Sequence, residues 1–146
     1  MSKEHFKLKS AAHLFLVRND KILLLRRFNT GYKDGNYSVP AGHLDGGESV
    51  KAAMVRESLE EIGIIVRLDD LKVVHVMHRI EDGEERIDFF LTTTVWTGEP
   101  KNKEPNKCDE LHWFPIDDMP SNVIPYIRSA IKDFKANSTF SEFGWN

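Results

Sequence analysis

One segment of the chain places acidic side chains and a glycine at spacings that could hold metal ions. It contains Gly42, Glu48 and the run Arg56-Glu57-Ser58-Leu59-Glu60-Glu61-Ile62-Gly63-Ile64. On a helix, Glu57, Glu60 and Glu61 lie at positions i, i+3 and i+4, so their carboxylates share one face, about 5 to 6 Å apart. Like charges at that spacing repel one another, and the hard divalent cations Mg2+ and Mn2+ prefer oxygen ligands. The segment therefore predicts a divalent metal site.

The full pattern of this segment resembles the Nudix box, which reads Gly-x5-Glu-x7-Arg-Glu-U-x-Glu-Glu-x-Gly-U, where U is aliphatic. Residues 42–64 carry every fixed glycine, glutamate and arginine of that pattern. The departure is Ser58, which stands where the pattern has an aliphatic side chain. That position packs rather than reacts, so we expect a weaker core contact and unchanged chemistry. On these residues the chain is identified as a member of the Nudix family.

The box glutamates are the expected metal ligands. Glu57 and Glu61 sit one helical turn apart and are the first choices for binding Mg2+, while Glu60 beside them is a third ligand or the general base. The resemblance implies that the backbone carbonyl of Gly42 completes the coordination shell. Family members differ in which glutamate acts as the base, so Glu57, Glu60 and Glu61 all stay candidates for that catalytic role.

Glu48 and Arg56 are expected to support catalysis from beside the ligands. They lie eight residues apart and share a helix face if the helix starts by Glu48. The resemblance implies that they tie the loop to the helix, so Arg56 is interpreted as structural first and as a phosphate contact second. The glycines of Asp45-Gly46-Gly47 let the backbone bend close to phosphates before the helix N-terminus, where amide groups favour anions.

A further metal ligand could come from outside the box. The stretch Gly98-Glu99-Pro100-Lys101-Asn102-Lys103-Glu104 resembles one in the MutT branch of the family, and that resemblance gives Glu104 the role. The alternative is a solvated charge in a loop that is polar throughout. Glu110 is a weaker candidate for the same role.

Three residues are candidates for substrate binding, and each has a structural alternative. Tyr37 precedes the box loop and could stack on a base or lie in the core. His43 follows Gly42 in the phosphate loop, or is only a polar loop residue. Asn122 ends a run, Met119-Pro120-Ser121-Asn122, that resembles the MutT-branch region whose asparagine contacts guanine. The favoured interpretation of Asn122 is nevertheless a cap for the helix that follows.

Composition narrows the class of protein. The chain has 146 residues, 40% hydrophobic and 29% charged, which suits one domain spanning residues 1–146. Its net charge of −3 gives no basic patch for a nucleic-acid polymer or an anionic membrane. The single Cys108 excludes an internal disulfide, no apolar run approaches the roughly 20 residues of a membrane helix, and the N-terminus opens no apolar signal segment. We expect a cytoplasmic protein that acts on a small-molecule nucleotide.

Apolar runs separated by turn-forming residues predict the strands. They are expected at residues 11–17, 22–25, 71–77, 86–96 and 111–114, with turns at residues 19–20 and 82–83. Two helices complete the pattern, one in the box and one near the C-terminus. Mixed strands with two packing helices predict an α/β fold, an α/β/α sandwich with a mixed β-sheet, which the resemblance also implies.

Each predicted helix has an apolar stripe. In the box helix it consists of Ala52, Val55, Leu59 and Ile62, turned away from the carboxylates, and in the second helix of Ile124, Ile127, Ile131 and Phe134. Pro125 suits the first turn of the second helix, with Ser121 or Asn122 as its N-cap. Residues 137–146 form an aromatic tail, which we expect to dock on the domain or on a second subunit, so a homodimer stays open.

The resemblance implies a Mg2+-dependent pyrophosphohydrolase. The Glu104 and Asn122 matches favour a nucleoside triphosphate, oxidised or otherwise non-standard, that is cleaved to the monophosphate and pyrophosphate. The alternative substrate is ADP-ribose or a nucleotide sugar, which the run Pro40-Ala41-Gly42 favours. A non-catalytic nucleotide-sensing module and an isopentenyl diphosphate isomerase are further alternatives, but the complete box favours hydrolysis.

Overall fold

The structure, a computed structural model, describes residues 4–146. Residues 1–3, which begin the N-terminus predicted to carry no signal segment, lie outside that range. The elements are β1 (Lys9–Phe15), β2 (Val17–Arg18), β3 (Lys21–Arg27), β4 (Tyr37–Ser38), β5 (Ala41–His43), α1 (Val50–Ile62), the short 3-10 helix η1 (Leu68–Asp70), β6 (Lys72–Glu81), β7 (Glu84–Thr92), β8 (Cys108–Pro115), α2 (Pro125–Lys135) and β9 (Phe140–Phe143).

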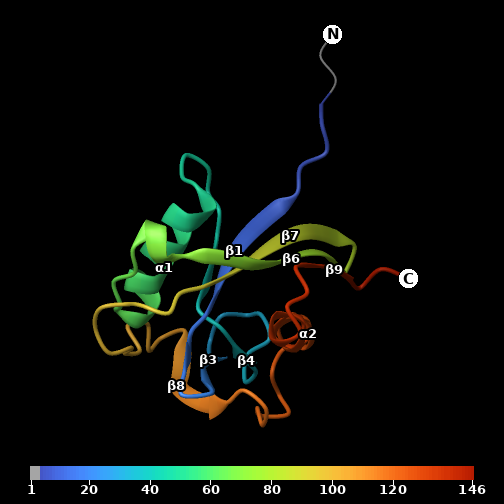
Figure 1. The fold of residues 1–146 in the computed structure, drawn as a ribbon. Helices are drawn as coiled ribbons and strands as arrows, with labels where there is room; N and C mark the ends of the chain where they lie inside the picture. The colour runs from blue at the N-terminus through green and yellow to red at the C-terminus, as the bar shows by residue number, and fades with distance from the viewer. Residues whose placement is uncertain (1–3) are drawn as a thin grey trace.

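Two sheets form the centre of the fold (Figure 1). The larger has the order β5-β1-β7-β6-β9 and is mixed, because β1 runs parallel to β7 and β6 parallel to β9, while its other pairs are antiparallel. The smaller joins β2, β3 and β4, with β8 paired to β3. Side chains of β1 alternate between two cores: Phe15 shares one with Ile127 of α2, and Leu14 shares the other with Met54 of α1. A helix therefore covers each face, and the predicted α/β fold with a mixed sheet is confirmed.

The two predicted turns are both present. Asp82 and Gly83 have φ values of 52° and 76° and join β6 to β7, and Asn19 and Asp20 have values of 52° and 61° and join β2 to β3. The strand expected at residues 11–17 is divided, because β1 pairs with β5 and β7 in the larger sheet while β2 pairs with β3 in the smaller one. A strand that changes partners in this way has no signature in its apolar pattern.

The buried face of α1 differs from the predicted one. The buried residues are Ala53, Met54, Ser58 and Ile62, whereas Leu59 is 52% exposed, so the predicted stripe through Leu59 is wrong. Ser58 is fully buried because its hydroxyl donates to the carbonyl of Met54 at 2.7 Å, which satisfies the polar group. Ser58 therefore packs in the core, as expected for its position in the box pattern, although the predicted stripe did not include it.

The helix α2 keeps its predicted apolar stripe but not its predicted cap. Ile124 is the N-cap and makes no side-chain capping bond, so the assignment of Ser121 or Asn122 is wrong. The backbone explains the difference: the N–H of Tyr37 donates to the carbonyl of Asn122, and the N–H of Ile124 donates to the carbonyl of Tyr37. These bonds hold the segment extended against β4, so the helix can begin only at Pro125.

No helix within residues 4–146 is long and apolar enough to cross a membrane.

The aromatic tail docks on its own chain. β9 extends the larger sheet by pairing in parallel with β6. Beyond it, Nε1 of Trp145 donates to the carbonyl of His78 at 3.1 Å, and the two rings lie 4.7 Å apart between centroids. The tail thus packs against β6 of the same chain.

Candidate active site

One cavity of about 760 Å3 contains most of the residues predicted from the box. Glu57, Glu60 and Glu61 line it, and Glu104 joins them from the loop before β8. We call these four residues the carboxylate cluster. Gly42 and His43 of β5 line the same cavity.

The start of the box, which lies in β5, is packed tightly against α1. A Cβ atom added to Gly42 would lie 2.1 Å from Cδ of Glu57, so only glycine leaves room for that carboxylate. The backbone N–H of Ala41 donates to Oε2 of Glu61 at 2.8 Å. These two contacts fix β5 beside the helix and set both glutamates at the cavity wall.

The carboxylate cluster carries negative charge without sufficient compensation. Burial raises the pKa of Glu57, even though the neighbouring Arg56 acts to lower it. Burial, followed by the charge of Glu57, raises the pKa of Glu61 well above its usual range. The charge of Glu104 adds to both effects. Crowded carboxylates that resist ionisation are the environment that a bound cation would stabilise.

The donor set of this cluster fits a hard divalent cation. It consists of carboxylate oxygens beside the backbone of Gly42, which are the ligands that Mg2+ and Mn2+ prefer. Among residues 4–146, no three acidic, histidine or cysteine side chains are already arranged around one point. The evidence for a metal therefore lies in the chemistry and charge of these residues.

Arg56 links the loop to the helix from outside the cavity lining. Its guanidinium donates to Glu48 at 2.6 Å and to Glu57 at 2.7 Å, and it lies 3.5 Å from Glu60. These bonds, first with Glu48 and then with Glu57, raise the pKa of Arg56. The helix begins at Val50 after an N-cap at Ser49, so Glu48 precedes it rather than starting it. Arg56 thus orients Glu57, a predicted metal ligand.

A compact turn presents Glu104 to the box. The amide side chain of Asn102 accepts from the N–H of Glu104 at 3.0 Å and donates to the carbonyl of Cys108 at 2.6 Å. The carbonyl of Glu104 accepts from the N–H of Lys107 at 2.9 Å. Cys108 also lines the cavity, and burial raises the pKa of its thiol. Glu110, the weaker candidate, lies outside the cavity lining and accepts from the hydroxyl of Tyr37 at 2.7 Å.

Two of the three predicted substrate contacts lie away from the cavity. Tyr37 is buried in the core that contains Phe15 and α2, which is its structural alternative. Asn122 is exposed, and its side chain donates to the carbonyl of Gly35 at 2.8 Å. His43 is the one of the three that lines the cavity, and its contact with a substrate stays a prediction.

A second group of residues in the cavity lining was not predicted from the sequence. It consists of His13 on β1, Arg79 on β6, Asp88 on β7 and Tyr126 on α2, which we call the arginine cluster. Asp88 accepts from Nε of Arg79 at 2.8 Å and pairs with Nε2 of His13 at 3.1 Å. Burial alone would raise the pKa of Asp88, but its bonds with His13 and Arg79 lower it to about 2.

The sequence held one signal for this cluster. In β6 the buried positions alternate through His75, Met77 and Arg79, and in β7 Asp88 and Phe90 are buried. Arg79 and Asp88 thus point to the buried side of their strands, the side that also carries the apolar Met77 and Phe90. Charged residues in that phase need partners, and strand pairing supplies them because Met77, two residues from Arg79, lies opposite Asp88.

Comparison with known proteins gives relatives over most of the chain. A family model described as the NUDIX domain matches residues 7–134. The chain is 30% identical to the ADP-ribose pyrophosphatase of Methanocaldococcus jannaschii over 119 residues, 82% of this chain and 68% of that protein. It is 29% identical to the 8-oxo-dGTP diphosphatase of Escherichia coli over 123 residues, 83% of this chain and 94% of that protein. The crystal structure of a MutT NUDIX hydrolase from Burkholderia pseudomallei matches with a TM-score of 0.79 and 28% identity, over 87% of this chain and 98% of that one.

Proposed function

This chain belongs to the Nudix family, and from that premise we propose that it is a Mg2+-dependent pyrophosphohydrolase of a nucleoside diphosphate linked to another group. The observation that carries the proposal is the carboxylate cluster, in which Glu57, Glu61 and Glu104 line one cavity beside Gly42. Hydrolysis of a phosphoric anhydride needs charge neutralisation, an oriented water and a base. Carboxylates can serve all of these needs.

The chain's own residues divide the work. Glu57, Glu61 and Glu104, with Glu60 and the carbonyl of Gly42, would hold Mg2+, and Mn2+ suits the same oxygen ligands. The bound metal supplies charge neutralisation for the phosphates and an acidified water. Arg56 orients Glu57 through its 2.7 Å bond. The general base is one of Glu57, Glu60 and Glu61, and basic residues that line the same cavity, Arg27, Arg86 and Lys107, can attract phosphate oxygens.

Two substrate classes fit this site. We place a nucleoside triphosphate first, cleaved to the monophosphate and pyrophosphate, because Glu104 lies in the carboxylate cluster and the relative from Escherichia coli bears the name 8-oxo-dGTP diphosphatase. ADP-ribose or a nucleotide sugar is the second candidate. It is favoured by the run Pro40-Ala41-Gly42 and by the relative named ADP-ribose pyrophosphatase.

A panel assay tests the proposal. The purified protein is incubated with Mg2+ and dGTP, 8-oxo-dGTP, dATP, ADP-ribose, nucleotide sugars or dinucleoside polyphosphates, and the products are separated chromatographically. We expect pyrophosphate and a monophosphate from a triphosphate. AMP and a sugar phosphate would select the second candidate instead. If no substrate in the panel is cleaved although Mg2+ is bound, the result would contradict hydrolysis and favour a nucleotide-sensing module.

A matched pair of variants connects the activity to the carboxylate cluster. Glu57→Gln should lower kcat at least about a thousandfold without unfolding the protein, because a predicted metal ligand loses its charge. Glu99→Gln is the control, since Glu99 is an exposed glutamate that pairs with Arg18 outside the cavity lining. Equal activity of the two variants would overturn the assignment of Glu57.

A further inference from the structure

The arginine cluster buries charged groups that the proposed hydrolysis does not use. Arg79 and His13 are 3% exposed, Asp88 is 1% exposed and Tyr126 is 7% exposed, yet all line the cavity. A buried ion pair is a costly way to stabilise a fold, because apolar residues of similar volume often serve as well or better. Its position in the wall of a substrate cavity suggests that it binds a ligand.

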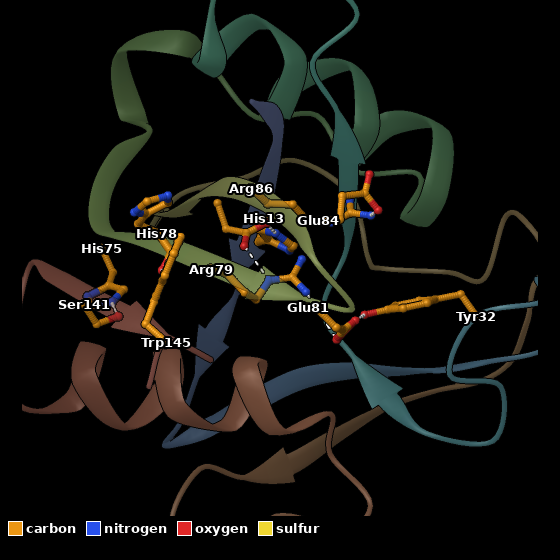
Figure 2. Close-up of polar contacts among 11 residues, drawn as sticks. His13, Tyr32, His75, His78, Arg79, Glu81, Glu84, Arg86, Ser141 and Trp145 are labelled. Atoms are coloured by element: carbon orange, nitrogen blue, oxygen red, sulfur yellow. Dashed lines mark hydrogen bonds and ion pairs between the residues drawn. The ribbon is translucent and has the colours of Figure 1, made fainter. Parts of the chain in front are cut away.

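One nitrogen of Arg79, Nη2, takes part in none of the side-chain hydrogen bonds of residues 4–146. Its Nε donates to Asp88 at 2.8 Å, which leaves the hydrogens of Nη2 to other acceptors. Its Nη1 lies 3.5 Å from Glu81 (Figure 2). Among residues 4–146, the buried side-chain nitrogen and oxygen atoms without a partner are Nδ1 of His13 and Nε2 of His78. Nη2 of Arg79 is not one of them, so it reaches accessible space, and the cavity is the accessible space that Arg79 lines.

Tyr126 supplies a second polar atom beside Arg79. The guanidinium carbon of Arg79 lies 3.6 Å from the centroid of the Tyr126 ring, so the ring restricts the orientation of the guanidinium group. The Tyr126 hydroxyl takes part in none of the side-chain hydrogen bonds of residues 4–146. It is also not among the buried atoms that lack a partner, so it is accessible from the cavity that Tyr126 lines. Burial raises the pKa of Tyr126, which keeps the hydroxyl protonated and able to donate.

The charge around Arg79 selects against phosphate. Two carboxylates, Asp88 and Glu81, lie within 3.5 Å of its guanidinium nitrogens. Tyr32 holds Glu81 in place with a 2.8 Å hydrogen bond (Figure 2). The positive charge is therefore already offset. The remaining donors suit an uncharged acceptor, such as a carbonyl, ring nitrogen or hydroxyl oxygen, better than an anion.

We propose that Arg79 and Tyr126 determine substrate specificity by donating hydrogen bonds to the uncharged moiety attached to the diphosphate, with Asp88 as a positioning residue. The inference rests on the proposed function, because it assumes that the diphosphate occupies the carboxylate cluster. Arg27 lies close enough to both regions that its positive charge acts to lower the pKa of Glu61 and of Tyr126. The acceptor is supplied either by a nucleobase edge or by a sugar hydroxyl.

Three variants separate this role from a structural one. Tyr126→Phe removes only the hydroxyl. Arg79→Met/Asp88→Asn removes both charges of the pair, so that no buried carboxylate is left unpaired, and the amide oxygen at position 88 can still accept from His13. Arg18→Met is the control, because Arg18 pairs with the exposed Glu99 outside the cavity lining. Circular dichroism and thermal melting confirm that each variant is folded.

Calorimetric binding without metal provides a readout that does not depend on turnover. The dissociation constants of dGMP, dAMP and ribose 5-phosphate are measured for each protein. We expect the wild type and Arg18→Met to prefer one ligand by about tenfold or more, as a hydrogen bond from a charged donor allows. The double variant should lose that preference, and Tyr126→Phe should weaken it about threefold.

Each outcome has a defined meaning. Loss of discrimination between dGMP and dAMP identifies a base edge as the acceptor, and a loss confined to ribose 5-phosphate identifies a sugar hydroxyl. Ratios that are equal in all proteins, or no binding by the wild type, would overturn the inference. Hydrolysis of the substrate panel with the same ligand preference in every variant contradicts this inference alone. A wild-type preference that the variants lose, without hydrolysis of any substrate in the panel, contradicts only the proposed function.

Discussion

The carboxylate cluster and the arginine cluster line one cavity but are built in opposite ways. Three of the four carboxylates come from a single helix, where the spacing of the residues places them together. The arginine cluster takes one residue from each of β1, β6, β7 and α2. The first has an excess of like charge that calls for a cation, whereas the second neutralises its charges internally. The proposed roles in hydrolysis and in substrate recognition therefore fall to two regions whose charges are balanced differently.

After the loss expected for Glu57→Gln, the largest effect concerns the packing of the carboxylate cluster. Gly42→Ala should lower kcat/KM at least about a hundredfold, because the added Cβ would lie 2.1 Å from Cδ of Glu57 and displace that carboxylate. Steady-state kinetics with the best substrate measures the loss. Gly47→Ala is the control, since it strains a left-handed residue in open space. A similar loss in both variants would show that loop flexibility, not the position of Glu57, is limiting.

The second effect contrasts the stability of the two regions. Arg79→Met should reduce the free energy of unfolding by about 3 to 5 kcal/mol, because it removes the cation bonded to the buried Asp88 carboxylate and leaves only the contact with His13. Arg56→Met should cost much less, since Arg56 is one-third exposed and water can solvate the glutamates it leaves. Urea denaturation compares the two. Equal losses would mean that the Arg79 pair is effectively solvated.

The third effect is a pH dependence of opposite sign in the two clusters. The pKa of Asp88 is lowered from 3.8 to about 2, so its stabilising contribution is complete above pH 5 and is lost as pH falls toward 2. The stability difference between wild type and Asp88→Asn should therefore shrink by about 1 kcal/mol between pH 6 and pH 3. The pKa of Glu61 is raised, so without metal its ionisation destabilises the fold as pH rises above 4.5.

A matched measurement checks that opposite sign. Glu61→Gln should gain in stability relative to the metal-free wild type as pH rises from 4 to 7, and Mg2+ should stabilise the wild type more than the variant. Denaturant titrations at each pH, with and without Mg2+, provide the values. A pH-independent difference for both Asp88→Asn and Glu61→Gln would refute the electrostatic contrast between the clusters.

The smallest effect is expected at the departure from the box pattern. Ser58→Ala should change stability by less than about 1 kcal/mol and activity by less than about twofold, because the hydroxyl only returns a bond to the carbonyl of Met54 within the helix. Thermal melting and kinetics test this. A large loss of activity would reveal that Ser58 has a role beyond packing.

Sequence reasoning succeeded where short-range geometry decides the outcome. The turns at Asn19-Asp20 and Asp82-Gly83 form as predicted because their residues adopt left-handed backbone conformations locally. It failed at the buried face of α1, where the predicted stripe ran through the exposed Leu59 and left out Met54 and Ser58, which are buried. It failed again at the cap of α2, because distant Tyr37 binds the backbone of Asn122 and Ile124.

The amino-acid sequence alone determined the family pattern, the fold class and the carboxylates of α1, because helical periodicity fixes which neighbours share a face. Tertiary structure decided the rest of the site. It brought Glu104 to the box, placed Tyr37 in the core, tied Asn122 to Gly35 and paired Arg79 with Asp88. Arg79 and Asp88 meet across one hairpin, nine residues apart, whereas the other contacts join residues far apart in the chain. Only strand pairing and packing of the whole fold determine which of them meet.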